Sequence, residues 1–220
     1  MARRPDVNGR ELILKAALRL FSREGPDAVS IRAVNREAGL GPASVHYHFG
    51  TKDALVDALI ERHAVTVVED VLERSRTLQH GEITPRAVIE ALAIPYWTLL
   101  ATDAEGWEWI RLIGWLMSSQ PERVQEPEVD ALVAQAVLRC FPDANPAEVD
   151  QTLQMAFQLL ISHLTSRPHH GRRLGNFQDD AAFTRLLAFL SGGLRETLQP
   201  SGPCRENPTS TMALQGSTPG

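Results

Sequence analysis

The chain has 220 residues, of which 43% are hydrophobic and 22% charged, a composition typical of an ordinary globular protein with one large or two small domains. This apolar content, with dispersed glycine and proline, excludes a collagen-like fibre, a coiled-coil rod and disorder of the whole chain. The two cysteines, Cys140 and Cys204, have no paired spacing, so neither a disulfide framework nor a zinc site is expected. No apolar run is long enough to cross a membrane or act as a secretion signal, and we therefore expect a cytoplasmic protein.

Charge is divided unevenly along the chain. The formal net charge is −5, but residues 1–52 contain nine basic and five acidic residues, a net charge of +4, so the remainder carries −9. A short basic module joined to a larger acidic one is typical of a DNA-binding head on a regulatory body, because only the head must approach phosphates. Chance clustering of charges on solvated helix faces is the alternative.

Apolar residues recur at three- and four-residue spacing along most of the chain, between boundaries rich in glycine, proline and aspartate. Strand signals are missing, so we predict an all-α fold. The segment after Pro200, rich in Ser, Gly, Pro and Thr, has too little apolar surface to fold and is predicted to be a disordered tail over residues 200–220. The expected helices span residues 12–21, 31–38, 43–49, 52–78, 84–102, 107–118, 127–141, 146–167 and 179–198. Thr51 is expected to cap the helix at 52–78, and Thr84-Pro85 to start the next one.

Residues 31–49 are the most informative segment, because two short helices are separated there by a tight turn. Ser30 is expected to cap the first of them and Gly39 to end it, while Pro42 should occupy the first position of the second. In such a helix-turn-helix the first helix braces the second, which can enter the major groove of DNA. Val45 and Phe49 would anchor this second helix inward, leaving small, aromatic and hydrogen-bonding side chains outward.

Residues 10–60 resemble the DNA-binding head of the TetR family of bacterial transcriptional regulators. The resemblance rests on the first-helix stretch at residues 16–21 with Gly25, on the sequence Val-Ser-Ile-Arg at residues 29–32, and above all on Val-His-Tyr-His-Phe-Gly-Thr-Lys-Asp-Ala-Leu at residues 45–55. It implies an N-terminal three-helix head and a C-terminal helical bundle that binds a ligand and dimerises. We accordingly place the DNA-binding domain at residues 1–52 and the effector-binding and dimerisation domain at residues 53–199.

The resemblance also implies which side chains meet DNA. The positions of Tyr47 and Lys52 touch phosphates in family members, and the early residues of the recognition helix read bases. The predicted DNA-contacting residues are Ser30, Arg32, Pro42, Ala43, Ser44, His46, Tyr47, His48 and Lys52.

Three positions depart from the family pattern. Many members have serine where Gly41 stands, glycine where Ala43 stands, and alanine where Asn35 stands. These departures bear on the operator sequence more than on DNA binding itself.

Histidines and aromatic residues are the candidate ligand-binding groups in the chain. His46 and His48 point to different faces of a helix, and no cysteine or aspartate joins them as a further metal ligand. DNA contact or packing is therefore favoured over a metal pair. His63 and His163 lie in apolar helices and are more simply packed or hydrogen-bonded histidines. Aromatic residues cluster in the middle of the body and could wall a pocket for an apolar effector, although plain core packing is the alternative. The residues proposed for this pocket are Tyr96, Trp97, Trp107, Trp115, Met117 and Phe157, with Trp109 and Met155 nearby.

No catalytic motif, cofactor-binding loop or metal-ligand spacing occurs in the chain, so we expect no enzyme activity, no cofactor and no metal. The helices at 146–167 and 179–198 carry more apolar surface than a monomer would expose and, through the resemblance, become the expected homodimer interface. The sequence thus predicts a repressor of transcription that binds a near-palindromic double-stranded operator and is released by a small apolar ligand, without contact with a membrane. A transcriptional activator, a helical partner-binding protein and a helical enzyme are the alternatives.

Overall fold

The computed structural model describes residues 7–78, 83–166 and 174–199, and within these ranges every regular element is a helix. The all-α prediction is therefore confirmed. The α-helices are α1 (Val7–Glu24), α2 (Ile31–Glu37), α3 (Ser44–Phe49), α4 (Lys52–Thr77), α5 (Pro85–Thr102), α6 (Gly106–Ser119), α7 (Pro127–Cys140), α8 (Pro146–Ser166) and α9 (Ala181–Leu198).

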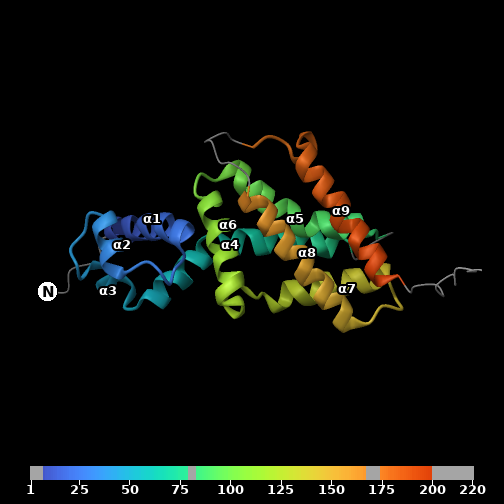
Figure 1. Cartoon of the computed structure of the whole chain (residues 1–220), viewed down its shortest axis with the longest axis horizontal. Helices are drawn as coiled ribbons and strands as arrows, with labels where there is room; N and C mark the ends of the chain where they lie inside the picture. Colours follow the sequence, from blue (N-terminus) through green and yellow to red (C-terminus); the bar gives the residue numbers. More distant parts are fainter. Residues whose placement is uncertain (1–6, 79–82, 167–173, 200–220) are drawn as a thin grey trace, which may run out of the picture.

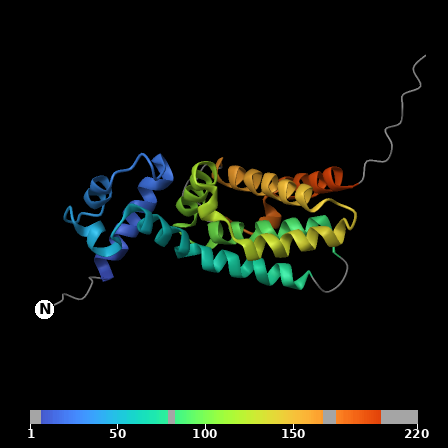
Figure 2. The ribbon, with the colours of Figure 1, turned by 90° about the horizontal axis from the view of Figure 1, so that it is seen from below.

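The molecule is elongated, with a small head at one end and a larger helical body at the other (Figure 1). Helices α1, α2 and α3 pack against one another to form the head, and the first turns of α4 pack against α1 and α3. The remainder of α4 runs along the body, where it contacts α5 and α7, as the view from below shows (Figure 2). One continuous helix thus joins the head to the body.

Helix starts follow the capping residues that the sequence indicated. The side-chain oxygens of Ser30 and Thr51 accept the backbone N–H groups of Ala33 and Ala54 at 3.2 and 3.1 Å. Thr84 caps α5 in the same way. These bonds satisfy N–H groups that the first turn of a helix leaves without a backbone partner.

One local prediction is wrong, and two short elements were not predicted. Helix α3 begins at Ser44, so Pro42 precedes the helix and Ala43 is its N-cap residue, because residues 41–44 form a turn in which the Ser44 N–H bonds the Gly41 carbonyl at 3.0 Å. The sequence also did not predict two short 3-10 helices, η1 (Pro121–Val124) and η2 (Phe177–Asp179). Segments of three or four residues are too short to show a hydrophobic period.

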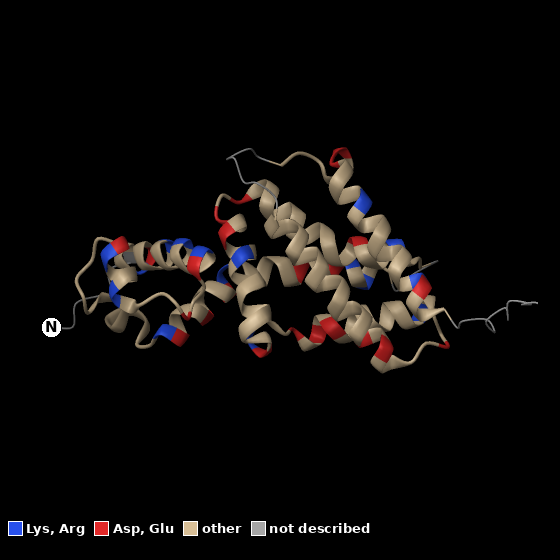
Figure 3. Ribbon diagram, viewed as in Figure 1, with Lys and Arg blue, Asp and Glu red and all other residues tan. Residues whose placement is uncertain are grey.

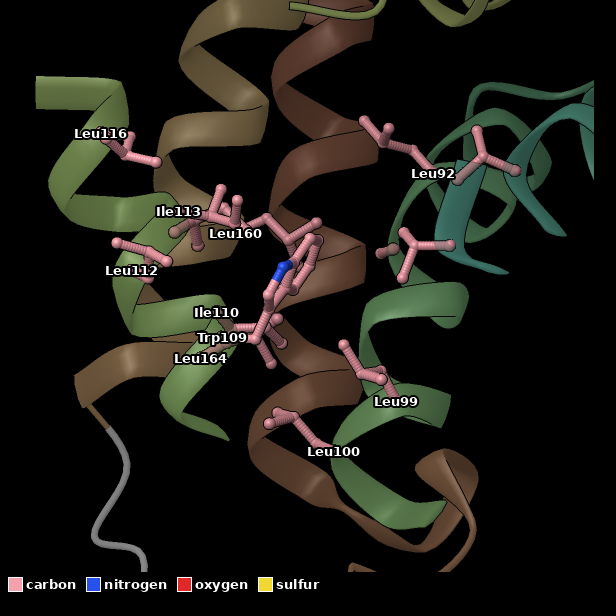
Figure 4. Close-up of a cluster of buried hydrophobic side chains, with 14 of the residues drawn as sticks. Leu92, Leu99, Leu100, Trp109, Ile110, Leu112, Ile113, Leu116, Leu160 and Leu164 are labelled. Atoms are coloured by element: carbon pink, nitrogen blue, oxygen red, sulfur yellow. The ribbon is translucent and has the colours of Figure 1, made fainter. Parts of the chain in front are cut away.

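The core of the body is built from all the helices from α4 to α9. Figure 4 shows part of it, where Trp109 lies among aliphatic side chains labelled on α5, α6 and α8. None of the helices in the described ranges is long and apolar enough to cross a membrane. The predicted tail, residues 200–220, lies outside the described residues.

Helix α6 docks the body onto the end of α1. The side chains of Arg111 and Trp115 both donate to the Ser22 carbonyl, at 3.2 and 3.3 Å. Gly25 has φ +81°, and a Cβ atom at this position would lie 3.2 Å from the Trp115 ring. Glycine is required here both by the backbone conformation and by the close approach of the indole. Trp115 is therefore a contact between head and body.

Candidate nucleic-acid interface and ligand cavity

Helix α3 presents a narrow outward face held by a buried anchor. Val45 is 1% exposed, whereas Tyr47 is 60% exposed and His46 is also exposed. Phe49 is half-buried, and the Arg10 guanidinium lies 5.0 Å from the centre of its ring. This inward packing fixes the rotation of α3, so the same residues always face outward.

Asn35, from the neighbouring helix α2, holds the start of α3. Its side-chain oxygen accepts the Val45 N–H at 3.1 Å, and its side-chain nitrogen donates to the Pro42 carbonyl at 2.8 Å. Ala43 has no side chain that could cap α3, and no capping bond from it is present. Asn35 therefore supplies from another helix the cap that the sequence of α3 lacks.

The His46 ring is oriented by the end of its own helix. Its Nδ1 lies 2.7 Å from the Gly50 carbonyl oxygen. Because a carbonyl only accepts, Nδ1 must carry the proton, which leaves Nε2 as the ring nitrogen that can meet a base or a phosphate. Nε2 accepts a hydrogen bond when the ring is neutral and donates one when it is charged.

The remaining predicted DNA-contacting residues gather around α3. The Ser30 hydroxyl oxygen accepts a hydrogen bond at the start of α2, and Arg32, two residues later, is exposed. Pro42 and Ala43 are exposed, Ser44 is half-buried, and His48 lies edge-on to Tyr47 with ring centres 5.0 Å apart. At the start of α4, the Lys52 ammonium reaches only a long, 3.5 Å contact with the Asp27 carbonyl. The structure thus places these residues on α2, on α3 and its preceding turn, and at the start of α4.

The charge division noted in the sequence is visible on the folded chain (Figure 3). Lysine and arginine residues are spread over α1, α2 and the start of α4, whereas acidic residues follow one another from η1 into α7. The head therefore offers a positive surface to phosphates and the body does not.

A small cavity lies in the body between α4, α5, α6, the η1–α7 segment and α8. Its volume is about 30 Å³, enough for roughly two water molecules. Ten residues line it: Ile60, Ala64, Val67, Val68, Tyr96, Trp109, Ile113, Val124, Glu126 and Phe157.

Two of the six aromatic or methionine residues proposed as pocket lining, Tyr96 and Phe157, line this cavity, with ring centres 5.4 Å apart. Trp97 lies elsewhere, packed against Phe183 at 4.5 Å, and its N–H donates to the Gly175 carbonyl. Trp107, Trp115 and Met117 also lie outside the lining. Composition alone did not separate these roles, because core, junction and cavity all use the same residue types.

Arg123, in η1, connects the edge of this cavity to the head. It donates to the Asp53 backbone carbonyl at 2.9 Å, to the Asp53 carboxylate at 3.2 Å and to the Asp57 carboxylate at 2.5 Å. Both acids lie in the first two turns of α4, next to Lys52, and the neighbouring Val124 lines the cavity. We call this set of contacts the Arg123 clamp.

A second, shallower groove of about 130 Å³ runs between α8 and α9 on the surface of the body. Its rim carries large apolar side chains with unusual exposure: Met155 is 58%, Leu159 39% and Phe189 68% exposed. A contiguous exposed apolar surface of this kind is typical of a protein interface.

Comparison with known proteins agrees with this architecture. Residues 13–59 match the family model described as bacterial regulatory proteins of the tetR family, and residues 90–193 match the model of a tetracyclin repressor-like C-terminal domain. A structure of a TetR-family transcriptional regulator from Bordetella parapertussis superposes with a TM-score of 0.56 at 20% identity, covering 82% of this chain and 93% of the other.

Two curated relatives are similar over part of their length and part of this chain. A transcriptional repressor of Mycobacterium tuberculosis is 33% identical over 104 residues, which are 42% of this chain and 55% of that protein. The nicotine-responsive repressor HdnoR of Paenarthrobacter nicotinovorans is 26% identical over 97 residues, 44% of this chain and 48% of that protein. The chain thus spans about half the length of the curated relatives it matches. The two family models together cover most of both the head and the body, and the chain belongs to the TetR family of bacterial regulatory proteins.

Proposed function

We propose that the protein is a homodimeric, sequence-specific DNA-binding repressor whose operator affinity is lowered by a small apolar ligand. The observation that carries this proposal is the rigid presentation of His46 and Tyr47 on α3, over a positively charged head. Base edges would be met by residues of the turn before α3 and by His46, and phosphates by Arg32, Tyr47 and Lys52. Such a protein acts where the DNA is, in the cytoplasm, and needs no catalytic step or cofactor.

The two predicted domains have separate tasks in this proposal. Residues 1–52 would contact DNA, and residues 53–199 would bind the ligand and the second subunit. The exposed groove between α8 and α9, which Phe189 lines, supports a two-fold interface, because a second copy would bury the same apolar surface in both subunits. A dimer presents two recognition helices, so the operator should be a near-palindrome.

Ligand binding would act by widening this narrow cavity. At about 30 Å³ the cavity is too small for an organic ligand, which must therefore open it to bind. A ligand that binds only the open form shifts the protein toward that form. Opening displaces Val124, and with it the adjacent Arg123 clamp on the first turns of α4. The start of α4 would then move relative to α3, which lowers operator affinity.

The clamp gives a testable prediction. Arg123→Ala should weaken operator binding of the ligand-free protein by about threefold to tenfold, because roughly 1 kcal/mol of contacts that orient α4 is lost. Fluorescence anisotropy with a labelled operator duplex measures this change. Arg76→Ala, which removes an exposed ion pair with Glu128 at the far end of α4, serves as the matched control and should have little effect.

A second variant separates orientation from simple charge. The double change Asp53→Asn and Asp57→Asn also breaks the ion pairs of the clamp but removes two negative charges near the DNA. Electrostatics alone predicts tighter operator binding for this variant, whereas loss of the clamp predicts weaker binding. Tighter binding would therefore contradict the proposed role of Arg123.

The function itself is tested by selecting bound duplexes from a random DNA library with the purified full chain. We expect enrichment of a near-palindrome whose affinity falls steeply as salt concentration rises. Tyr47→Ala and Lys52→Ala should each weaken binding to the selected duplex. If a folded protein enriches no sequence, DNA recognition by this head is refuted.

A further inference from the structure

The cavity in the body combines an aromatic wall with an acidic edge. Tyr96 and Phe157 meet edge to face, and Trp109 lies beside them, 3% exposed. The Trp109 N–H already donates to the carbonyls of Leu59 and Ile60, at 2.9 and 3.1 Å. The indole can therefore offer a ligand only its carbon surface, and aromatic carbon surfaces attract cations.

Carboxylates gather at the side of the cavity where η1 leads into α7. Glu126 lines the cavity itself, Asp130 follows one turn later, and Asp150 of α8 lies near Asp130. Partial burial, together with the like charge of Asp150, raises the pKa of the Asp130 carboxyl above its ordinary value. Asp130 and Asp150 therefore repel one another, and a nearby positive charge would relieve that repulsion.

No described lysine or arginine forms an ion pair with Glu126, Asp130 or Asp150. Arg123, the basic residue nearest in sequence to Glu126, is directed instead at the acids of α4 in the clamp. The acidic edge of the cavity is thus not neutralised by a cation from the described part of the chain.

Tyr96 adds a polar group at the same place. Burial and the nearby charges of Glu126 and Asp130 raise the pKa of its phenol, so the hydroxyl stays protonated. None of the hydrogen bonds among the described residues involves this hydroxyl. Glu126, Asp130 and Asp150 are exposed and solvated, so a neutral ligand gains nothing from them, whereas an anionic ligand is repelled and a cation is attracted.

We propose that the effector of this protein is an organic cation with apolar groups, which binds with its charge beside Glu126 and its apolar part against Tyr96, Trp109 and Phe157. The proposal rests on the proposed function, since it takes this cavity as the effector site. A quaternary or tertiary ammonium fits best, because its charge is spread over carbon and is weakly hydrated. Its size requires the closed cavity to open.

The test compares two probes of the same shape that differ in charge. Benzyltrimethylammonium and its neutral carbon isostere, neopentylbenzene, are titrated into the full chain without DNA, with tryptophan fluorescence as the readout. We expect the cation to bind at least about tenfold more tightly. Glu126→Gln should weaken cation binding about fivefold, as for a partly exposed ion pair, and leave the isostere unchanged. Glu122→Gln removes an exposed acid outside the cavity lining and should change neither affinity.

Equal or tighter binding of the isostere overturns the proposal, as does failure of the cation to bind the folded protein at millimolar concentration. An unchanged preference for the cation in Glu126→Gln overturns the assignment to this site. Because DNA is absent from the titration, the result is separate from the proposed function. A protein that selects an operator but ignores the cation refutes only the ligand class, and a protein that binds the cation but selects no operator refutes only the DNA-binding function.

Discussion

Phe189→Asp is expected to convert the protein from a dimer to a monomer and to weaken operator binding at least about a hundredfold. Phe189 is 68% exposed in the single chain, so the substitution should leave the fold of the subunit intact, and circular dichroism should be unchanged. In the dimer, the aspartate would be buried without a partner beside the apolar groove formed by α8 and α9, which is strongly unfavourable. Sedimentation velocity at micromolar concentration distinguishes the mass of a monomer from that of a dimer.

The loss of operator affinity follows from the loss of linkage between the two heads. When one head of a dimer is bound, the second binds at a high effective concentration, whereas two monomers must each bind independently. The matched control is Val65→Asp, because Val65 is 59% exposed on α4 and lies outside the groove. This variant should remain a dimer with unchanged operator affinity. A Phe189→Asp protein that remains dimeric would place the interface on another surface.

The fold was largely predictable from the sequence because helix periodicity and capping are local. Thr51 begins α4 as predicted, and the expected α5 and α8 lie within one residue of the observed helices. Pro42 was misplaced because proline favours the first turn of a helix, yet here residues 41–44 form a separate turn. The choice between these two positions depends on Asn35, seven residues away from Pro42 and on another helix.

The DNA-facing residues and the cavity were predictable to different degrees, because only local patterns can be recognised in a sequence. The outward residues of α3 follow from a short local motif, and their placement on one face needed no tertiary information. The cavity depends instead on how five segments converge, so Trp109 and Glu126 could not be separated from other aromatic and acidic residues by sequence pattern. The Arg123 clamp joins residues that are 66 to 70 positions apart in the sequence, so no local sequence pattern predicts it.

Asn35→Ala is expected to destabilise the head by about 2–4 kcal/mol and to weaken operator binding by at least tenfold. Asn35 is 2% exposed, and its loss would leave the Val45 N–H and the Pro42 carbonyl without their partners in a poorly hydrated site. Alanine also leaves a small void between α2 and α3. The affinity loss arises because α3 would be held less firmly at the end that meets base edges. Urea unfolding and anisotropy with the selected operator measure the two effects.

The control for Asn35 is Glu37→Ala, on the same helix, which removes only an exposed ion pair with Arg19 and should cost less than about 1 kcal/mol. The resemblance described above implies alanine at the position of Asn35 and serine at the position of Gly41 in many family members. In this chain neither Gly41 nor Ala43 can cap α3, so the cap is supplied by Asn35. If Asn35→Ala bound the operator as tightly as the unmodified chain, the start of α3 would not need this cap. Replacing Gly41 with serine in the Asn35→Ala background should recover part of the lost stability if the two positions serve one purpose.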